Sequence, residues 1–186
     1  MTRATILTVD DDVAVSQAIT RDLRSRYSAD YQIVTATSGA EGIESTLVML
    51  AYKLRDGVSV VRDSGGDVPR LEANPGELNQ VWTNLIDNAI DAMDGHGTLR
   101  IATRAEGDSV VVEVVDSGPG MPPEIKAHAF EPFFTTKDVG KGTGLGLDIS
   151  RRIVVERHGG EITIDTRPGE TVLRVRLPRN RPEAPE

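Results

Sequence analysis

The stretch from Gly140 to Leu147, with the sequence GKGTGLGL, places glycine at every second position and then opens a helical pattern. Glycines leave backbone N–H groups bare, and such groups leading into a helix form a site for anions, of which phosphate is the natural one. A P-loop is excluded because Lys141 is followed by glycine rather than Ser or Thr. A dinucleotide-binding fold is not indicated either, because its glycine motif would need a strand directly before the glycines. A flexible linker would not lead straight into the apolar spacing of Leu145, Leu147, Ile149 and Ile153. The stretch therefore predicts a phosphate-binding loop.

Composition narrows the classes of protein that could carry such a loop. The chain has 186 residues, no Cys and a formal net charge of −8. Absence of Cys excludes disulfides and cysteine-bound zinc. The acidic balance argues against a nucleic-acid partner, which would require a basic face. No apolar run approaches the roughly 20 residues that span a bilayer, and the start MTRATILTVDDD does not match a signal peptide. We therefore expect a cytoplasmic protein without a membrane segment.

The apolar and turn patterns predict an alternating arrangement of helices and strands. Asn74-Pro75-Gly76-Glu77 is a strong helix start, and the apolar stripe that follows it predicts a core-facing helix to about Met93. Further elements are predicted at 41–55 (helix), 58–61 (strand), 63–69 (turn), 98–103 and 110–115 (strands), 145–157 (helix), and 161–166 and 171–177 (strands). The weakly periodic stretch 120–140 is too long for an ordinary connection, which predicts a functional loop.

Two asparagines on the central helix are candidate metal ligands. Asn84 and Asn88 are four residues apart, so both amides project from one face of the helix. A neutral amide oxygen suits a Mg²⁺ ion that is held mainly by phosphates and water. Taken alone, such residues are more often surface or capping side chains.

A second candidate group follows the strand at 110–115. Asp116-Ser117-Gly118-Pro119-Gly120 places a carboxylate where it could accept a hydrogen bond from an exocyclic amine. The missing side chains of Gly118 and Gly120 would let a flat ring approach the backbone. A plain turn is the competing interpretation of this pentapeptide.

The order of these motifs along the chain is similar to that of a known family. NQVWTNLIDNAIDAM resembles the N box, DSGPGM the G1 box, FEPFFTTK the F box and GKGTGLGL the G2 box of sensor histidine kinases. The resemblance covers roughly Ile43 to Pro178 and is specific, because four motifs appear in order at plausible spacing. It implies an α/β sandwich of the Bergerat type, a mixed sheet with helices on one face, as in the gyrase, heat-shock ATPase and mismatch-repair superfamily.

The resemblance also implies roles for individual residues, with ATP and Mg²⁺ as cofactors. Asn88, assisted by Asn84, would hold Mg²⁺, and Asp116 would bind the adenine amino group beside Gly118 and Gly120. The stretch 121–139 would be the ATP lid. The remaining implied contacts are Phe130, Phe133 and Phe134 as lid anchors, Lys137 or Lys141 on phosphate, Gly142, Thr143, Gly144, Leu145 and Gly146 around the triphosphate, and Thr171 beside the adenine pocket.

The position of Asn84 discriminates within this superfamily. The hydrolases, and the small serine kinases that regulate sigma factors, resemble one another in carrying Glu four residues before the metal-binding Asn. An amide cannot act as a base, so Asn84 shifts the interpretation from ATP hydrolysis toward phosphoryl transfer.

No histidine of the sequence fits the phosphoacceptor of such a kinase, which is followed by an acidic residue on a dimerisation helix. His96 lies in a Gly-His-Gly turn, His128 precedes alanine within the lid, and His158 precedes glycine at a helix end. We therefore expect all three to be structural or surface residues. The acceptor would be supplied in trans, by a histidine-containing dimerisation domain, with a response regulator as a further partner.

The N-terminal segment has a different character. Its β-α-β pattern, with ILTVDDD after the first strand, resembles the start of a response-regulator receiver, in which Asp10 and Asp11 would be the acidic pair. A receiver should continue with a third strand that ends in the phosphoacceptor Asp. Asp56 follows no buried strand, and Asp63 belongs to the first strand of the kinase-like domain. The segment is therefore predicted to be an incomplete receiver.

The sequence thus predicts a receiver-like segment at 1–40, a histidine-kinase-type ATP-binding domain at 43–178 and a frayed tail at 179–186. The predicted activity is transfer of the γ-phosphoryl group of ATP to a histidine in trans. A noncatalytic, nucleotide-gated interaction module and a slow ATPase are the alternatives, and Asn84 counts against the second.

Overall fold

The structure is a computed structural model of the chain. It describes residues 4–9, 18–19, 21–23, 26, 31–36, 43, 46–47, 50, 53–54, 57–65, 68–69, 71, 73–137 and 142–179. Asp10, Asp11, Asp56, Lys141 and all of the predicted tail except Arg179 lie outside the described residues, so the predictions made for them stay predictions.

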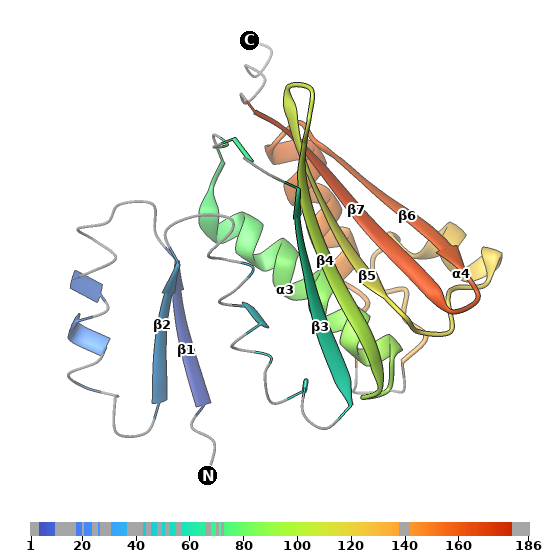
Figure 1. Ribbon diagram of the computed structural model, residues 1–186, viewed down its shortest axis with the longest axis horizontal. Helices are drawn as coiled ribbons and strands as arrows, with labels where there is room; N and C mark the ends of the chain where they lie inside the picture. The colour runs from blue at the N-terminus through green and yellow to red at the C-terminus, as the bar shows by residue number, and fades with distance from the viewer. Residues whose placement is uncertain are drawn as a thin grey trace.

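A five-stranded mixed sheet forms the centre of the fold (Figure 1). Its strands are β3 (Val58–Gly65), β4 (Gly97–Glu106), β5 (Ser109–Asp116), β6 (Glu161–Arg167) and β7 (Glu170–Pro178), in the order β3-β4-β5-β7-β6. β3 runs parallel to β4, and every other pair is antiparallel. In the part of the chain that the structure describes, the helical residues 75–92 and 146–157 pack against one face of the sheet, and the predicted mixed α/β sheet with helices is confirmed.

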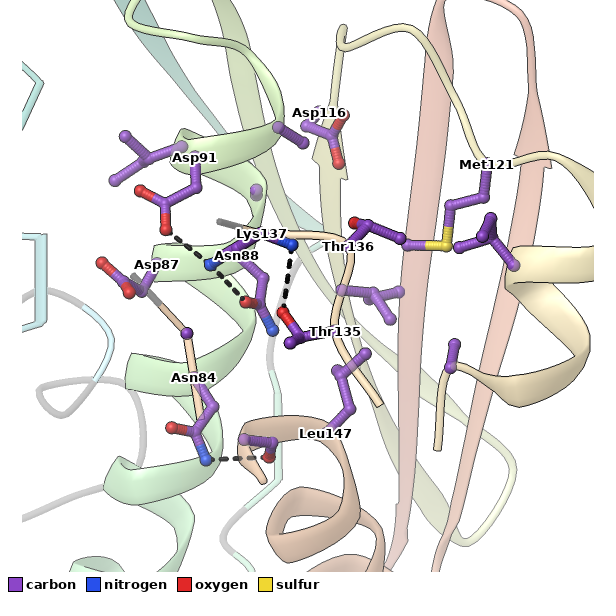
Figure 2. A pocket seen from close by; sticks show the side chains of 18 of the residues that line it. Asn84, Asp87, Asn88, Asp91, Asp116, Met121, Thr135, Thr136, Lys137 and Leu147 are labelled. Atoms are coloured by element: carbon purple, nitrogen blue, oxygen red, sulfur yellow. Dashed lines mark hydrogen bonds and ion pairs between the residues drawn. The ribbon is translucent and has the colours of Figure 1, made fainter. Parts of the chain in front are cut away.

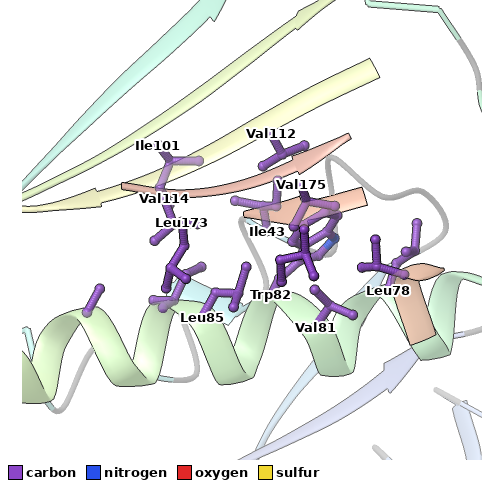
Figure 3. Packing of buried hydrophobic residues seen from close by; sticks show 14 of the residues in the cluster. Ile43, Leu78, Val81, Trp82, Leu85, Ile101, Val112, Val114, Leu173 and Val175 are labelled. Carbon is purple, nitrogen blue, oxygen red and sulfur yellow. The ribbon is translucent and has the colours of Figure 1, made fainter. Parts of the chain in front are cut away.

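The helix α3 (Pro75–Ala92) lies across the covered face of the sheet. It begins as predicted, because the Asn74 side chain accepts a hydrogen bond from the Glu77 backbone N–H at 3.1 Å and Pro75 occupies the first turn. Its apolar stripe is buried along its whole length against strand residues such as Val112 and Leu173 (Figure 3). Each such side chain contributes about 1.5–3 kcal/mol to the free energy of unfolding. Because the buried residues of α3 and of the strands contact one another, the helix and the sheet share one core.

The opposite face of the sheet carries charged side chains. Glu113 on β5 lies between Arg104 Nη1 at 3.1 Å and Arg174 Nε at 2.8 Å. Burial raises the pKa of Glu113, but the hydrogen bonds from Arg174 and Arg104 outweigh it and hold the pKa below its ordinary value. These two ion pairs hold the charge of Glu113 on the face of the sheet opposite α3.

The first strand of the sheet is longer than its sequence pattern predicts. The strand predicted at 58–61 extends into the predicted turn at 63–69, because Asp63 and Gly65 lie within β3 and pair with Ala102 and Arg104 of β4. The reason is tertiary, since the long strand β4 offers hydrogen bonds that override local turn preference. Asp63 belongs to this sheet, as predicted, and lies 3.8 Å from Arg100.

The predicted helix at 145–157 is present in two geometries. α5 (Gly146–Arg151) is α-helical and continues into the π-helical segment η2 (Arg152–Arg157). The helix ends at Gly159, which has φ +61°, as the glycine pair in the sequence predicts. A short helix, α4 (Pro123–His128), lies within the long loop, where no regular element was expected.

The N-terminal segment contains β1 (Ala4–Val9) and β2 (Tyr31–Ala36), which pair in parallel as a separate two-stranded sheet. The described residues between them, 18–19, 21–23 and 26, are helical, which agrees with the predicted β-α-β order. In the predicted helix 41–55, residues 43, 46 and 47 are helical, and Ile43, Leu47 and Leu50 are buried in the core of the main domain.

Candidate functional site

A cavity of about 1350 Å³ opens between α3, the end of β5, the long loop and the start of α5. The predicted residues that line it are Asn84, Asn88, Asp116, Gly120, Phe134, Lys137, Gly142, Thr143, Gly144 and Gly146. They come from segments that lie far apart in the sequence and meet only in the fold (Figure 2).

Asp116 lies at one end of the cavity, at the last position of β5. Asp116 is only 3% exposed as a residue, because β5 is the central strand of the sheet and this side chain lies on its covered face. Burial raises the pKa of Asp116, while the Gly118 backbone N–H, which donates to Oδ1 at 2.9 Å, acts in the opposite direction. Gly118 does not line the cavity, but a Cβ there would lie 2.7 Å from this same oxygen.

Gly120 and Thr166 build the wall beside this carboxylate. Gly120 has φ +83°, and a Cβ at this position would lie 2.4 Å from the Arg167 carbonyl oxygen. Thr166 accepts the Met121 backbone N–H at 2.8 Å and lies 3.4 Å from the Thr171 hydroxyl. Thr171 is buried opposite Asp116 in the β5–β7 register and does not line the cavity itself. The wall is therefore fixed by neighbouring strands.

Asn84 connects α3 to the start of α5. Its Nδ2 donates to the Gly146 carbonyl oxygen at 3.0 Å and to Ser150 Oγ at 3.2 Å. Sequence reasoning placed Asn84 on the correct helix face but gave no indication of this contact. The amide nitrogen of Asn84 thus positions the glycine loop. The amide oxygen takes no part in these two hydrogen bonds.

Asn88 lies one turn further along α3 and faces Lys137 of the long loop (Figure 2). Lys137 Nζ is 3.2 Å from Asn88 Oδ1 and 2.6 Å from Asp91 Oδ2. Lys53, from the segment before the sheet, reaches the same region, with Nζ 2.9 Å from Asp91 Oδ1 and 2.5 Å from Asp87 Oδ1. Two lysines distant in sequence therefore converge on the acidic side of α3.

The three phenylalanines of the loop occupy different environments. Phe130 packs against the core, and Phe134 lines the cavity with its ring 5.7 Å from that of His128. Phe133 is 75% exposed, so the expectation that it anchors the loop is wrong for this structure. Its backbone adopts φ +67°, and its N–H donates to the Gly144 carbonyl oxygen at 2.9 Å, a pairing that directs its side chain outward.

Gly144 also has a left-handed backbone, with φ +67°. A Cβ at this position would lie 2.4 Å from the carbonyl carbon of Phe133. Leu145 precedes α5 and does not line the cavity, although its N–H donates to Thr143 Oγ1 at 3.4 Å. The glycine run is therefore packed against the loop that precedes it.

The three histidines lie outside the cavity lining. His96 is exposed in its turn, and His128 is exposed beside Glu131 at 2.8 Å. His158 is buried, accepts the Asn74 backbone N–H at Nε2 over 3.2 Å, and lies with Nδ1 2.9 Å from the Ile153 carbonyl oxygen. These positions agree with the expectation of structural or surface residues.

Sequence reasoning missed the charged residues Asp87, Asp91 and Lys53. A signal for the acids was present, because Asn84, Asp87, Asn88 and Asp91 follow the i, i+3, i+4, i+7 spacing of one helix face. Nothing in the sequence pointed to Lys53, whose contacts join residues more than thirty positions apart. No helix among the described residues combines the length and the apolar character needed to cross a membrane.

Comparison with known proteins links this geometry to sensor kinases. The chain is 38% identical over 148 residues to the sensor kinase CckA of Brucella abortus, an alignment that covers 71% of this chain and 16% of that protein. It is 36% identical over 132 residues to the sensory histidine kinase/phosphatase NtrB of Rhodobacter capsulatus, covering 64% of this chain and 36% of the relative. The chain thus spans well under half the length of these relatives.

Solved structures show the same fold. The catalytic domain of histidine kinase ThkA, in a nucleotide-free form, matches with a TM-score of 0.69 and 35% identity over 76% of this chain and 92% of that chain. ThkA in complex with the response regulator protein TrrA matches with a TM-score of 0.68 and 30% identity over 79% of this chain and 42% of that chain.

The profile of a single family matches residues 73–181, more than half of the sequence. Its match includes α3, the end of β5, the loop with Lys137 and the glycine run, and thus nearly all of the residues around the cavity. The chain belongs to the histidine kinase-, DNA gyrase B- and HSP90-like ATPase family.

Proposed function

We propose that residues 43–178 are the ATP- and Mg²⁺-binding catalytic domain of a two-component sensor histidine kinase, which transfers the γ-phosphoryl group of ATP to a histidine supplied in trans. The observation that carries the proposal is the convergence of Asn88, Asp116, Lys137 and the glycines 142, 144 and 146 on one cavity. The names of the relatives support the kinase class.

The sheet end of the cavity fits an adenine ring. Asp116 offers a buried carboxylate that can accept a hydrogen bond from the exocyclic amine. Gly118 keeps this carboxylate uncrowded, since a Cβ there would lie 2.7 Å from it. Gly120 forms part of the wall beside the carboxylate. Thr171 shapes the same wall through its contact with Thr166. Because ATP binding here needs the acceptor oxygens of Asp116, binding should weaken at acid pH, where the raised pKa leaves more of the carboxyl protonated.

The loop end of the cavity fits a triphosphate with its metal ion. Asn88 supplies a neutral amide oxygen, a hard ligand suited to Mg²⁺, and Asn84 supports it from the preceding turn of α3. Gly142, Gly144 and Gly146 present backbone close to this position, with Thr143 and Leu145 between them. Lys137 provides positive charge, and Phe130 and Phe134 hold the loop against the domain.

The reaction in this proposal breaks the bond between the γ-phosphorus and the β–γ bridging oxygen and forms a bond from phosphorus to an imidazole nitrogen. ADP leaves, and the imidazole proton passes to a base on the acceptor side. Mg²⁺ would supply charge stabilisation on the phosphates. The residues of this chain orient the nucleotide, and Asn84 supplies no base for activating a water molecule. This favours transfer over hydrolysis.

Residues 1–40 are proposed to be a receiver-like segment. The parallel pairing of β1 with β2 supports this, because a receiver begins with β-α-β. The proposal predicts that Asp10 and Asp11 bind Mg²⁺, which changes of amide chemical shifts in this segment during a Mg²⁺ titration would test.

A transfer assay tests the kinase proposal. The full chain is incubated with γ-labelled ATP, with and without a panel of histidine-containing dimerisation domains. We expect label on a supplied domain and none on the chain alone. Asn88→Ala should abolish transfer, while Gln80→Ala, on the exposed side of the same helix, should not.

Label on the chain alone would contradict the assignment of its histidines. Partner binding that depends on ATP, without transfer to any histidine domain, would instead favour a nucleotide-gated interaction module. Steady release of phosphate without a partner would favour an ATPase.

A further inference from the structure

Asp91 holds one lysine on each of its two carboxylate oxygens. Lys137 Nζ lies 2.6 Å from Oδ2, and Lys53 Nζ lies 2.9 Å from Oδ1. Lys137 belongs to the long loop, whereas Lys53 precedes the family match that begins at residue 73. Asp91 thus connects the segment before the ATPase fold with the loop over its cavity. Figure 2 shows the contact of Asp91 with Lys137.

The same ammonium group of Lys137 lies 3.2 Å from Asn88 Oδ1. This is the oxygen that the proposed function assigns to Mg²⁺. An amide oxygen with an ammonium group at this distance already has a cationic partner. A second cation on the same oxygen would lie within a few ångströms of the first, where like charges repel strongly.

The surroundings keep Asp91 charged and the contact partly shielded. Burial alone raises the pKa of Asp91, but hydrogen bonds from Lys137 and Lys53 outweigh it, so the pKa lies below its ordinary value. The side chains of Asp91 and Lys137 are each 30% exposed, and that of Lys53 is 26% exposed. Asp91 is therefore ionised at neutral pH and carries the negative charge that both lysines contact.

We propose that Asp91 is a positioning residue that holds Lys137 on Asn88, so that Lys137 occupies the cation position there and must be displaced when Mg²⁺ and nucleotide bind. This inference rests on the proposed function, because it takes Asn88 as the metal ligand. Lys53 supports the arrangement by holding the other oxygen of Asp91. The resting contact thus sets the Mg²⁺ concentration at which the site fills.

A Mg²⁺ titration of nucleotide binding tests the proposal in the full chain. A fluorescent ATP analogue is held at one subsaturating concentration, and the Mg²⁺ concentration for half-maximal binding is measured. Asp91→Asn should lower this concentration about twofold to fivefold, the range of one partly exposed ion pair. Lys137→Gln should lower it as well but also weaken the analogue's binding, and Lys53→Met should have a smaller effect in the same direction.

Matched controls are Asp165→Asn on the outer face of the sheet and Lys126→Gln on the exposed side of α4. Neither residue lines the cavity, so neither variant should change the Mg²⁺ requirement. A raised Mg²⁺ requirement in Asp91→Asn would overturn the proposal, because it would make Asp91 itself a metal ligand. An unchanged requirement would overturn it too.

Amide hydrogen exchange of the nucleotide-free protein gives a readout that needs no metal. Asp91→Asn should speed exchange across residues 130–137, and equal rates in the variant and the parent would contradict the resting contact. If the parent binds no nucleotide at any Mg²⁺ concentration, the proposed function and this inference fail together. Mg²⁺-dependent binding that Asp91→Asn leaves untouched would overturn the inference alone.

Discussion

The two ends of the cavity are built in different ways. At the sheet end, Asp116 is fixed by the pairing of β5 with β4 and β7, and its carboxylate is almost fully buried. At the loop end, Lys137 is held by contacts between partly exposed side chains, and the exposed Phe133 has a left-handed backbone. The first arrangement cannot change without unpairing strands, whereas the second can change by rotating a few side chains.

Under the proposed function, the two ends of the cavity have different tasks. A pocket that recognises a flat base gains affinity from being preformed, because little conformational freedom is lost on binding. A site for a triphosphate and its metal ion must exchange cations and admit a partner's acceptor group, which requires movement. Variants at the sheet end should therefore change binding or stability throughout the domain, and variants at the loop end should act locally.

The largest expected effect is on nucleotide binding in Asp116→Ala. Removing the buried acceptor should weaken binding of ATP about tenfold to a hundredfold, the usual value of a charged hydrogen-bonding group. Calorimetric titration measures the loss, and Asp108→Ala, at the exposed turn before β5, should bind like the parent. Unchanged binding in Asp116→Ala would mean that the base lies elsewhere.

Alanine at Gly120 and at Gly144 should separate the ends of the cavity, because both have left-handed backbones and one lies at each end. Gly120→Ala combines a left-handed backbone with a collision against Arg167, so it should lower the free energy of unfolding by about 2–4 kcal/mol. Gly107→Ala, at φ +59° with nothing within 4 Å, should cost only about 1–2 kcal/mol. Urea unfolding followed by the fluorescence of the single tryptophan, the buried Trp82, measures both.

Gly144→Ala should behave differently, because the loop that it strikes can shift. We expect a smaller loss of unfolding free energy than for Gly120→Ala, but a larger loss of nucleotide binding relative to that destabilisation. Equal effects of the two variants on stability would break the comparison between the ends of the cavity.

Asn84→Asp tests the joint between α3 and α5. A carboxylate cannot donate to the Gly146 carbonyl oxygen, so that oxygen would face a second acceptor and the free energy of unfolding should fall by about 1–2 kcal/mol. Gln80→Glu adds the same charge on the exposed side of α3 and should cost little. Equal stabilities of the two variants would show that the Asn84 contact is not maintained in solution.

The smallest effects concern pH. The pKa of Asp116 is raised above 3.8, so its contribution to stability is present below that pH and is lost as the pH rises through the folded-state pKa. Glu113, on the other face of β5, has a pKa below 4.5, so its contribution is present above that pH and is lost as the pH falls. One pKa unit corresponds to about 1.4 kcal/mol.

Urea unfolding between about pH 3 and pH 7 should therefore give opposite slopes for two differences. Parent minus Asp116→Asn should decrease with rising pH, and parent minus Glu113→Gln should increase. Slopes of the same sign would contradict the two environments assigned to β5.

The sequence predicted the sheet end better than the loop end, for a physical reason. The apolar spacing of α3 and the strand ending in Asp116 are periodic, and periodicity reports which side chains face a core. The Lys53 and Lys137 contacts with Asp91 depend on how distant segments meet, which no local pattern encodes. The outward turn of Phe133 likewise follows from its pairing with Gly144 across the loop.

Two local deviations have the same origin. The extension of β3 through Asp63 and Gly65 is imposed by its partner strand, against the turn preference of these residues. The change from α to π geometry at Arg152 accompanies the contact of His158 with Ile153, which is settled by packing rather than by helix propensity.

The hydrogen bonds of His158 fix the chemistry of its ring. The Asn74 N–H can donate only to a bare Nε2, so the proton must be on Nδ1, where it faces the Ile153 carbonyl oxygen. An electrophile that attached to Nε2 would take the lone pair that accepts the N–H of Asn74, the N-cap residue of α3. Phosphorylation of His158 would therefore break the hydrogen bond at the start of the helix that carries Asn88. The same hydrogen bond and the burial of the ring keep Nε2 from reacting as a nucleophile.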